Sequence, residues 1–424
     1  MSPQFSIDRV YPSLLKRTKE LVDSTFLDDK RLSVLNYKNC YALPAKEITN
    51  KNGERCLGGG LCCGGEWVQN SGLNLHSLTP YAFNQNEAEC IEEEVIFIGI
   101  VSSIWGHAIT DGIQHLWWFN TEDYLSKYRD CKIYYWGDCP LTGNFLDLIQ
   151  LAGIDSSKLR FVNRPLLLKS VLIPDSCFVS QYPIGTHYYS EYITTIDYII
   201  SRCSIRSNCR NKVFFSEPSS TRNWGVEQIE KVAHKAGYHI IYPGRHSLQE
   251  QISILQSSTD VMVFESSVGH NIVFCKPGTH IIILRKANYA NIYQSAVNKI
   301  RDYSITLIDV HLSIMNNERF PYAGPFFVYA NASLCDYLAV MTPTFPWHKF
   351  KEYVRYNLYD SESSLYAKMS IPDNYTRILA NEIEKTRRIN LNRIESVLSL
   401  VPVPKDMKKR LLLKLLKIRI RHLL

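Results

Sequence analysis

The chain has 424 residues, of which 45% are hydrophobic and 21% charged, a composition typical of a folded protein with more than one domain. Its formal net charge of +7 lies in the last twenty residues, from Lys405 to Leu424, which hold eight Lys or Arg and one Asp. The rest of the chain is neutral, which argues against a general nucleic-acid-binding surface.

The N-terminus has no apolar run of signal-peptide length, and no later segment approaches the length of a membrane span. We therefore expect a cytoplasmic or membrane-peripheral protein. In such a setting the twelve cysteines, which are irregularly spaced, are expected to be reduced. Cys56, Cys62 and Cys63 alone suggest a metal, but a fourth close ligand is missing, so the sequence predicts no metal site.

The first 92 residues give the weakest signals. A helical pattern covers residues 12–27, and Gly/Cys-rich and Asn/Ser-rich connections follow it. The glycine run at 58–60 lacks the lysine and the spacing of a phosphate-binding loop, and we interpret it as a flexible loop. This part of the chain is predicted to be an extension of the first domain.

From residue 94 onward, strands alternate with helices. After a strand at 95–101 the pattern predicts a long helix that Ser102 or Ser103 could cap. Alternation of this kind is typical of an α/β domain. The further strands are expected at 132–136, 159–162 and 171–173, and the further helices at 145–152 and 187–203.

A more regular alternation begins at Lys212 and predicts a second, doubly wound α/β domain. Its strands are expected at 212–215, 238–242, 261–264, 280–284 and 305–308, and its helices at 226–236, 248–256 and 271–275. Two such domains leave a cleft between them as the expected ligand site. The predicted units are an N-terminal domain at 1–204, a second domain at 205–315, a returning helical segment at 316–400 and a basic tail at 401–424.

The predicted long helix carries His107, Asp111 and His115. Spacings of i, i+4 and i+8 place all three on one face of a helix. An aspartate hydrogen-bonded to a histidine can act as a general base that deprotonates a hydroxyl nucleophile. The alternative is a solvated polar face, on which an aspartate near a helix N-terminus is simply favourable.

The loop at 265–271 is the second candidate site, because it leaves the strand at 261–264 at the carboxyl edge of the predicted parallel sheet. Ser266, Ser267 and Gly269 could hold phosphate oxygens or ribose hydroxyls there, and Glu265 could accept from a hydroxyl. Arg222, in the loop after the strand at 212–215, could pair with a diphosphate. The alternatives are an ordinary turn for the loop and a surface charge for the arginine.

Several motifs together carry a family resemblance. They are Arg222, the pair Glu250-Gln251, the run Gly269-His270-Asn271 and the run Phe274-Cys275-Lys276-Pro277-Gly278. With them, residues 212–284 resemble the catalytic domain of glycosyltransferase family 61 and its bacterial capsular-polysaccharide relatives. The stretch GHAITDGIQHLWWF similarly resembles a Gly-His-containing helix of the family, whereas Glu217 stands where the family usually has an arginine.

The resemblance implies a GT-B-like fold, with two Rossmann-like domains that face an interdomain cleft and with C-terminal helices. It implies that a sugar moves from a nucleotide-sugar donor to a hydroxyl of a glycan or lipid-linked glycan, without a metal, in the synthesis of bacterial capsule or lipopolysaccharide. Asp111, assisted by His107, would be the base on the acceptor side. His270 and Asn271 would hold the donor.

The tail from Lys405 to Leu424 interleaves leucine and isoleucine with Lys and Arg, a pattern typical of a helix on an anionic membrane surface. This predicts a peripheral location on the inner face of the cytoplasmic membrane, and the alternative is a helix packed on the first domain or on a partner chain. Two other functions stay open. One is pyruvyl transfer from phosphoenolpyruvate to a polysaccharide, although the Arg-x-His element of that family is missing, and the other is a non-catalytic glycan-binding or assembly role.

Overall fold

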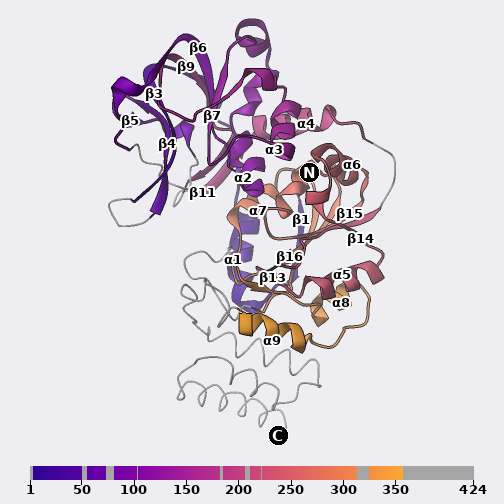
Figure 1. Ribbon diagram of the computed structural model, residues 1–424. Helices are drawn as coiled ribbons and strands as arrows, with labels where there is room; N and C mark the ends of the chain where they lie inside the picture. The colour runs from indigo at the N-terminus through magenta and orange to yellow at the C-terminus, as the bar shows by residue number, and fades with distance from the viewer. Residues whose placement is uncertain are drawn as a thin grey trace.

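The computed structural model describes residues 3–49, 55–72, 81–102, 104–181, 185–205, 211–220, 222–312 and 324–356. The predicted helix at 374–400 and the basic tail lie outside these residues. Two sheets form the framework, one of seven strands and one of six, with helices around them (Figure 1). Within the described part, no helix is long and apolar enough to cross a bilayer.

The six-stranded sheet has the order β1-β17-β16-β15-β12-β14, and all neighbouring strands are parallel. Its central strands are buried on both faces, which is why they read as unbroken apolar runs. The five strands predicted in the second half of the chain are confirmed in this sheet. Its strands are β1 (Gln4–Arg9), β12 (Lys212–Phe215), β14 (His239–Ile241), β15 (Asp260–Phe264), β16 (His280–Arg285) and β17 (Ser304–Asp309).

β1 brings the N-terminus into this sheet. It pairs with β17, and α1 (Pro12–Asp23) follows it and packs against α7 (Ile292–Val297). The sequence predicts this segment in the first domain instead. A short, partly exposed edge strand carries no local signal for its partner sheet, because tertiary packing decides such a pairing.

Without β1, the strand order is β14-β12-β15-β16-β17, so the chain changes its winding direction between β12 and β15. Ligands of doubly wound sheets bind outside the carboxyl ends of the strands at such a switch point. One face is covered by α5 and α8, and the other by α1, α6, α7 and the 3-10 helix η8. The bounds of these helices are α5 (Val226–Lys235), α6 (Leu248–Ser257), η8 (Gly269–Phe274) and α8 (Ala332–Tyr337).

The seven-stranded sheet has the order β5-β4-β3-β9-β6-β7-β8. β9, β6, β7 and β8 are parallel, whereas β3, β4 and β5 form an antiparallel half. The expectation of a Rossmann-like first domain is therefore corrected to a mixed sheet. Its strands are β3 (Val34–Thr49), β4 (Arg55–Cys63), β5 (Glu66–Trp67), β6 (Glu89–Ile100), β7 (Ile133–Trp136), β8 (Leu159–Phe161) and β9 (Leu166–Pro174).

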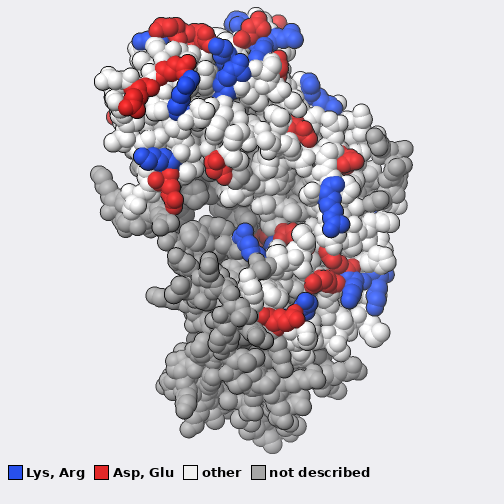
Figure 2. Space-filling model, in the orientation of Figure 1, with Lys and Arg blue, Asp and Glu red and all other residues white. Residues whose placement is uncertain are grey.

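One continuous apolar core joins the two sheets. It includes Ile96 of the mixed sheet, Val261 of the parallel sheet and Ile196 of α4. On the face drawn in Figure 2, acidic and basic side chains of the described residues are interspersed. The remaining elements include α3 (Gly143–Leu151), α4 (Ser190–Ser201), α9 (Trp347–Arg355), the small sheet of β2 (Leu27–Asp28), β10 (Phe178–Gln181) and β11 (Gly185–Tyr189), and the pair β13 (Asn223–Trp224) and β18 (Phe326–Phe327).

The glycine run at 58–60 lies in β4, so the prediction of a flexible loop is wrong. A Cβ atom on Gly60 would lie 2.0 Å from the indole ring of Trp67, and one on Gly59 would lie 2.6 Å from that of Trp136. Both glycines also have a positive φ, which other residues rarely adopt. The run therefore lets two tryptophans pack onto the backbone of a strand.

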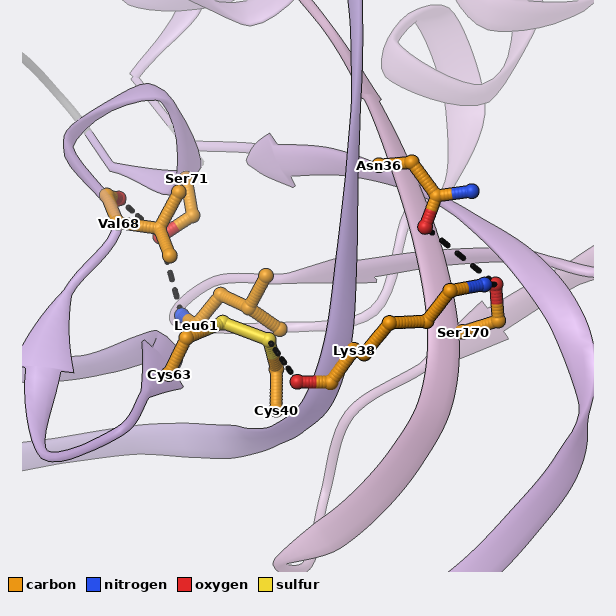
Figure 3. The surroundings of a disulfide bond; sticks show 8 residues. All are labelled: Asn36, Lys38, Cys40, Leu61, Cys63, Val68, Ser71 and Ser170. Atoms are coloured by element: carbon orange, nitrogen blue, oxygen red, sulfur yellow. Dashed lines mark hydrogen bonds between the residues drawn. A yellow bond between two sulfur atoms is a disulfide. The ribbon is translucent and has the colours of Figure 1, made fainter.

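A disulfide joins Cys40 of β3 to Cys63 of β4 (Figure 3). The two residues are direct partners in the antiparallel register, with Cα atoms 4.4 Å apart. The expectation that all cysteines are reduced is therefore wrong for this pair. The spacing along the chain does not reveal the pairing, because the strand register creates it.

Replacing both Cys40 and Cys63 by serine is expected to lower the free energy of unfolding by about 3 kcal/mol, since the disulfide restricts the unfolded chain. Urea denaturation of the double variant and of the reduced wild type should give the same loss. Cys90→Ser, at an exposed free cysteine, is the control and should match the wild type. Alkylation of both thiols before any reduction would contradict the prediction.

Candidate active site

The long helix predicted after the first strand is broken into short pieces. They are α2 (Trp105–Ile109), the 3-10 helices η3 (Asp111–Ile113) and η4 (Leu116–Asn120) and the π-helical η5 (Tyr124–Tyr128). The break falls at Thr110, whose backbone leaves the helical region and whose hydroxyl donates to the carbonyl of Gly106 over 2.9 Å. Such a side-chain bond to the preceding turn competes with regular helix formation.

His107 and Asp111 lie on either side of this break and are still hydrogen-bonded to each other. Nδ1 of His107 lies 2.9 Å from Oδ2 of Asp111. The carboxylate is fully buried, whereas 21% of the imidazole side chain is exposed. An ionised carboxylate can only accept, so the imidazole donates from Nδ1 and keeps Nε2 as an acceptor. The arrangement can remove a proton at Nε2 of His107 while Asp111 orients the ring.

His115 does not join this pair. Its Nδ1 lies 2.6 Å from the carbonyl oxygen of Pro174, at the end of β9, and its side chain is completely buried. Burial lowers its pKa to about 4, so the imidazole is neutral. The prediction that all three residues share one face is wrong, because the helix ends before the third of them.

The start of α2 contacts η8 from the other sheet. His270 donates from Nδ1 to the carbonyl of Gly106 at 3.2 Å, and Trp105 donates from Nε1 to Oδ1 of Asn271 at 2.6 Å. A Cβ on Gly106 would lie 2.9 Å from Oγ of Ser267. Glycine is therefore needed here, and the predicted donor-side loop lies directly against the helix of the His107 pair.

Both His270 and Asn271 are buried. Burial lowers the pKa of His270 to about 4, so its Nε2 is an acceptor, and this atom has no partner among the described residues. Asn271 uses its amide nitrogen to donate to Gln251 at 3.2 Å and its oxygen to accept from Trp105. Asn271 therefore links α2, which follows a strand of the mixed sheet, to α6, which covers the parallel sheet.

A polar cluster occupies the switch point between β12 and β15. Lys286 donates to Oε2 of Glu217 at 2.7 Å and to Oδ1 of Asn223 at 3.2 Å. Asn223 also donates to Glu217 at 2.9 Å, and Ser266 donates to its other oxygen. These residues, which we call the switch-point cluster, come from the loops after β12, β15 and β16.

Arg222 lies beside this cluster on an exposed stretch of the loop after β12. Its carbonyl oxygen accepts from the backbone of Phe326 at 2.7 Å, and the β13–β18 pair continues this contact. The loop that carries Arg222 and Asn223 is thereby held by the C-terminal part of the chain. The structure thus brings Arg222 and Ser266 to one edge, as the sequence predicts.

Glu265 lies in a different environment. Together with Arg285 and Asp309 it forms a row across the carboxyl ends of β15, β16 and β17. Arg285 binds Asp309 through two bonds of 2.6 and 2.9 Å and donates to Thr18 of α1. A small pocket beneath α1 is lined by Glu265, Arg285 and Thr18, among others. Burial raises the pKa of Glu265 to about 7. The nearby charge of Arg285 lowers this pKa only in part, because Arg285 pairs with Asp309.

Glu265→Gln is expected to make the protein more stable at pH 8 but not at pH 5. An acid whose pKa is raised on folding stabilises the folded state only while it is protonated, and this contribution is lost as pH rises from about 4.5 to about 7. The difference between variant and wild type should reach up to about 3 kcal/mol. Urea denaturation at both pH values measures it, with the exposed Glu122→Gln as control. A difference that does not change with pH would contradict the assignment.

Sequence reasoning missed several residues of these clusters. The sequence patterns do not single out Lys286 or Asn223, and they mark Glu217 only as a departure from the family pattern. The sequence does hold a signal for Lys286, because this charged residue directly follows the apolar strand β16 and so lies on the edge where ligands bind. No local signal links Glu217 to Lys286, which are 69 positions apart in the sequence.

Residues 105–282 match the glycosyltransferase 61 family. This span begins at α2, includes the His107–Asp111 pair and the loops after β12 and β15, and ends within β16. The chain therefore contains a glycosyltransferase family 61 domain. No curated protein matches the chain significantly. The family match thus favours glycosyl transfer over pyruvyl transfer and over a non-catalytic role.

Proposed function

We propose that the protein transfers a sugar from a nucleotide-sugar donor to a hydroxyl of a glycan acceptor, in the synthesis of a bacterial surface polysaccharide such as capsule or lipopolysaccharide. The observation that carries the proposal is the contact between α2 and η8. It sets Gly106, which directly precedes His107, next to Ser267, while the adjacent Ser266 donates to Glu217 in the switch-point cluster. The proposed proton acceptor therefore lies close to the ligand-binding edge of the parallel sheet.

The two sheets would act as the two halves of a GT-B-like enzyme, with the acceptor on the mixed sheet and the donor on the parallel sheet. His107 takes the proton from the acceptor hydroxyl, the freed oxygen bonds to the anomeric carbon, and the bond from that carbon to the diphosphate oxygen breaks. Asp111 orients the imidazole and stabilises its protonated form. The burial of Asp111 supports this division of roles over one in which the aspartate itself is the base.

On the donor side, Arg222 would offset the negative charge of the leaving diphosphate, since a guanidinium binds phosphate oxygens in pairs. Its exposure at the switch point supports this role. His270 offers Nε2 as an acceptor for a hydroxyl of the sugar. The proposed reaction uses these side chains without a metal cofactor.

The test is a thermal-shift screen of the full chain in EDTA against UDP-, GDP- and CMP-sugars. One nucleotide class should raise the melting temperature, and Arg222→Ala should abolish the rise. Arg202→Ala removes an arginine that packs on Tyr198 of α4 and should leave the rise intact. No response to any nucleotide sugar, with or without added Mg²⁺, would overturn the proposed donor class.

The proposal extends to membrane docking through residues 405–424, which lie outside the described residues. Their basic and apolar sequence supports binding to anionic lipid, at about 1 kcal/mol per basic residue near the surface. Deletion of these residues should abolish cosedimentation with phosphatidylglycerol vesicles and leave transfer to a soluble acceptor intact. A location on the inner face of the cytoplasmic membrane stays a prediction, which the disulfide does not favour, because such bonds are rare in the cytosol.

A further inference from the structure

Lys286 is an unusually buried lysine at the edge where ligands of this fold bind. It follows β16 directly, and only 6% of its side chain is exposed. Lysine is almost never buried to this extent without a partner. Its position lies beyond the segment matched to the family, which ends at residue 282.

The contacts of Lys286 leave part of its ammonium group unused. An ammonium carries three hydrogens, and the described residues supply two acceptors, Glu217 and Asn223. The rings of Phe326 and Phe264 flank the nitrogen, with centroids 4.8 and 5.7 Å away. They stabilise the cation through their faces. Among the described residues, one hydrogen of the ammonium group therefore has no acceptor.

The other members of the switch-point cluster hold Lys286 in one orientation. Burial by itself raises the pKa of Glu217. The charge of Lys286 and the hydrogen bonds from Lys286, Ser266 and Asn223 outweigh this effect and bring the pKa below its ordinary value. Glu217 is therefore ionised and cancels the charge of Lys286. Arg222, on the same loop, adds one further positive charge at this edge.

A buried ion pair is a weak source of stability, because desolvation offsets most of the attraction between its charges. We propose that Lys286 binds an oxygen of the donor's diphosphate at the switch point, with Glu217 and Asn223 as positioning residues. The inference rests on the proposed function, since it needs a nucleotide donor. It explains why an ion pair lies at the switch point with one lysine hydrogen unused, beside an exposed arginine.

The test compares binding of UDP, GDP, inorganic pyrophosphate and the free nucleosides to the full chain by calorimetry. Lys286→Met alone would leave Glu217 buried and uncompensated, so the decisive variant is Glu217→Gln with Lys286→Met, which removes both charges. Glu217→Gln alone keeps the lysine. Lys299→Met is the matched control, because that lysine also packs over an aromatic ring, Phe26, and donates to a backbone carbonyl, away from this edge.

We expect the double variant to bind the preferred nucleoside diphosphate about 10- to 100-fold more weakly, the loss typical of one charge-assisted hydrogen bond. Pyrophosphate binding should fall equally, and nucleoside binding should not change. Glu217→Gln, which keeps the lysine but weakens a positioning contact, should lose less affinity than the double variant, and Lys299→Met should retain diphosphate affinity. Wild-type affinity in a folded double variant would overturn the inference and leave the proposed function standing. If the wild type binds no nucleotide, the proposed function fails, and the inference fails with it.

Discussion

His107→Ala is expected to lower kcat by about 10²- to 10⁴-fold, the usual contribution of a positioned general base. KM for the acceptor should change little, because the partly exposed imidazole removes a proton during transfer and is not proposed to bind the acceptor. Asp111→Asn should give a loss in the same range. An amide that donates to Nδ1 turns the ring into the wrong tautomer, with its proton on Nε2. Initial rates with the donor found in the nucleotide screen measure both effects.

His348→Ala is the matched control for this prediction. His348 and Glu352 form the same i, i+4 arrangement on α9, with Nδ1 3.3 Å from the carboxylate, but the imidazole is almost fully exposed. Its loss should leave kcat unchanged. Near-wild-type kcat in His107→Ala would show that the base lies elsewhere, whereas loss in both histidine variants would point to a general effect on folding.

Asp309→Ala is expected to lower the free energy of unfolding by about 3–5 kcal/mol, because it leaves a buried guanidinium without its partner. Arg285 and Asp309 are both essentially inaccessible to solvent. The carboxylate also accepts from the backbone nitrogen of Tyr11, so its loss loosens the N-terminal segment as well. Urea denaturation measures the loss. Glu265 can offset part of it, because Asp309 no longer raises the pKa of that neighbouring carboxyl.

Two comparisons isolate the cause of this loss. Asp123→Ala removes the partner of Lys127 in an exposed i, i+4 ion pair, and such pairs contribute little. The double variant Arg285→Met with Asp309→Leu removes both buried charges and should recover most of the stability. A double variant as unstable as Asp309→Ala would show that the contacts to Tyr11 and Thr18, and not the unpaired charge, carry the effect.

Local patterns predicted the central part of the fold well. β15 and β16 read as apolar runs because both faces of the strands are covered. The predicted helix at 248–256 is confirmed as α6, and a capping box of Ser247 and Glu250 starts it. The i, i+4 spacing also placed His107 beside Asp111. The same spacing failed at His115, because it assumes an unbroken helix.

The sequence by itself determined the class of enzyme, through its resemblance to a family. It also determined the parallel sheet and the pairing of His107 with Asp111, since these two depend on periodicity and on contacts within about one helical turn. Tertiary structure alone decided the partners of β1, the disulfide between Cys40 and Cys63, and the switch-point cluster. These contacts join residues far apart along the chain, and strand register and packing select them only after the sheets form. The pairing of Lys286 with Glu217 therefore became recognisable only once two distant strand ends lay side by side.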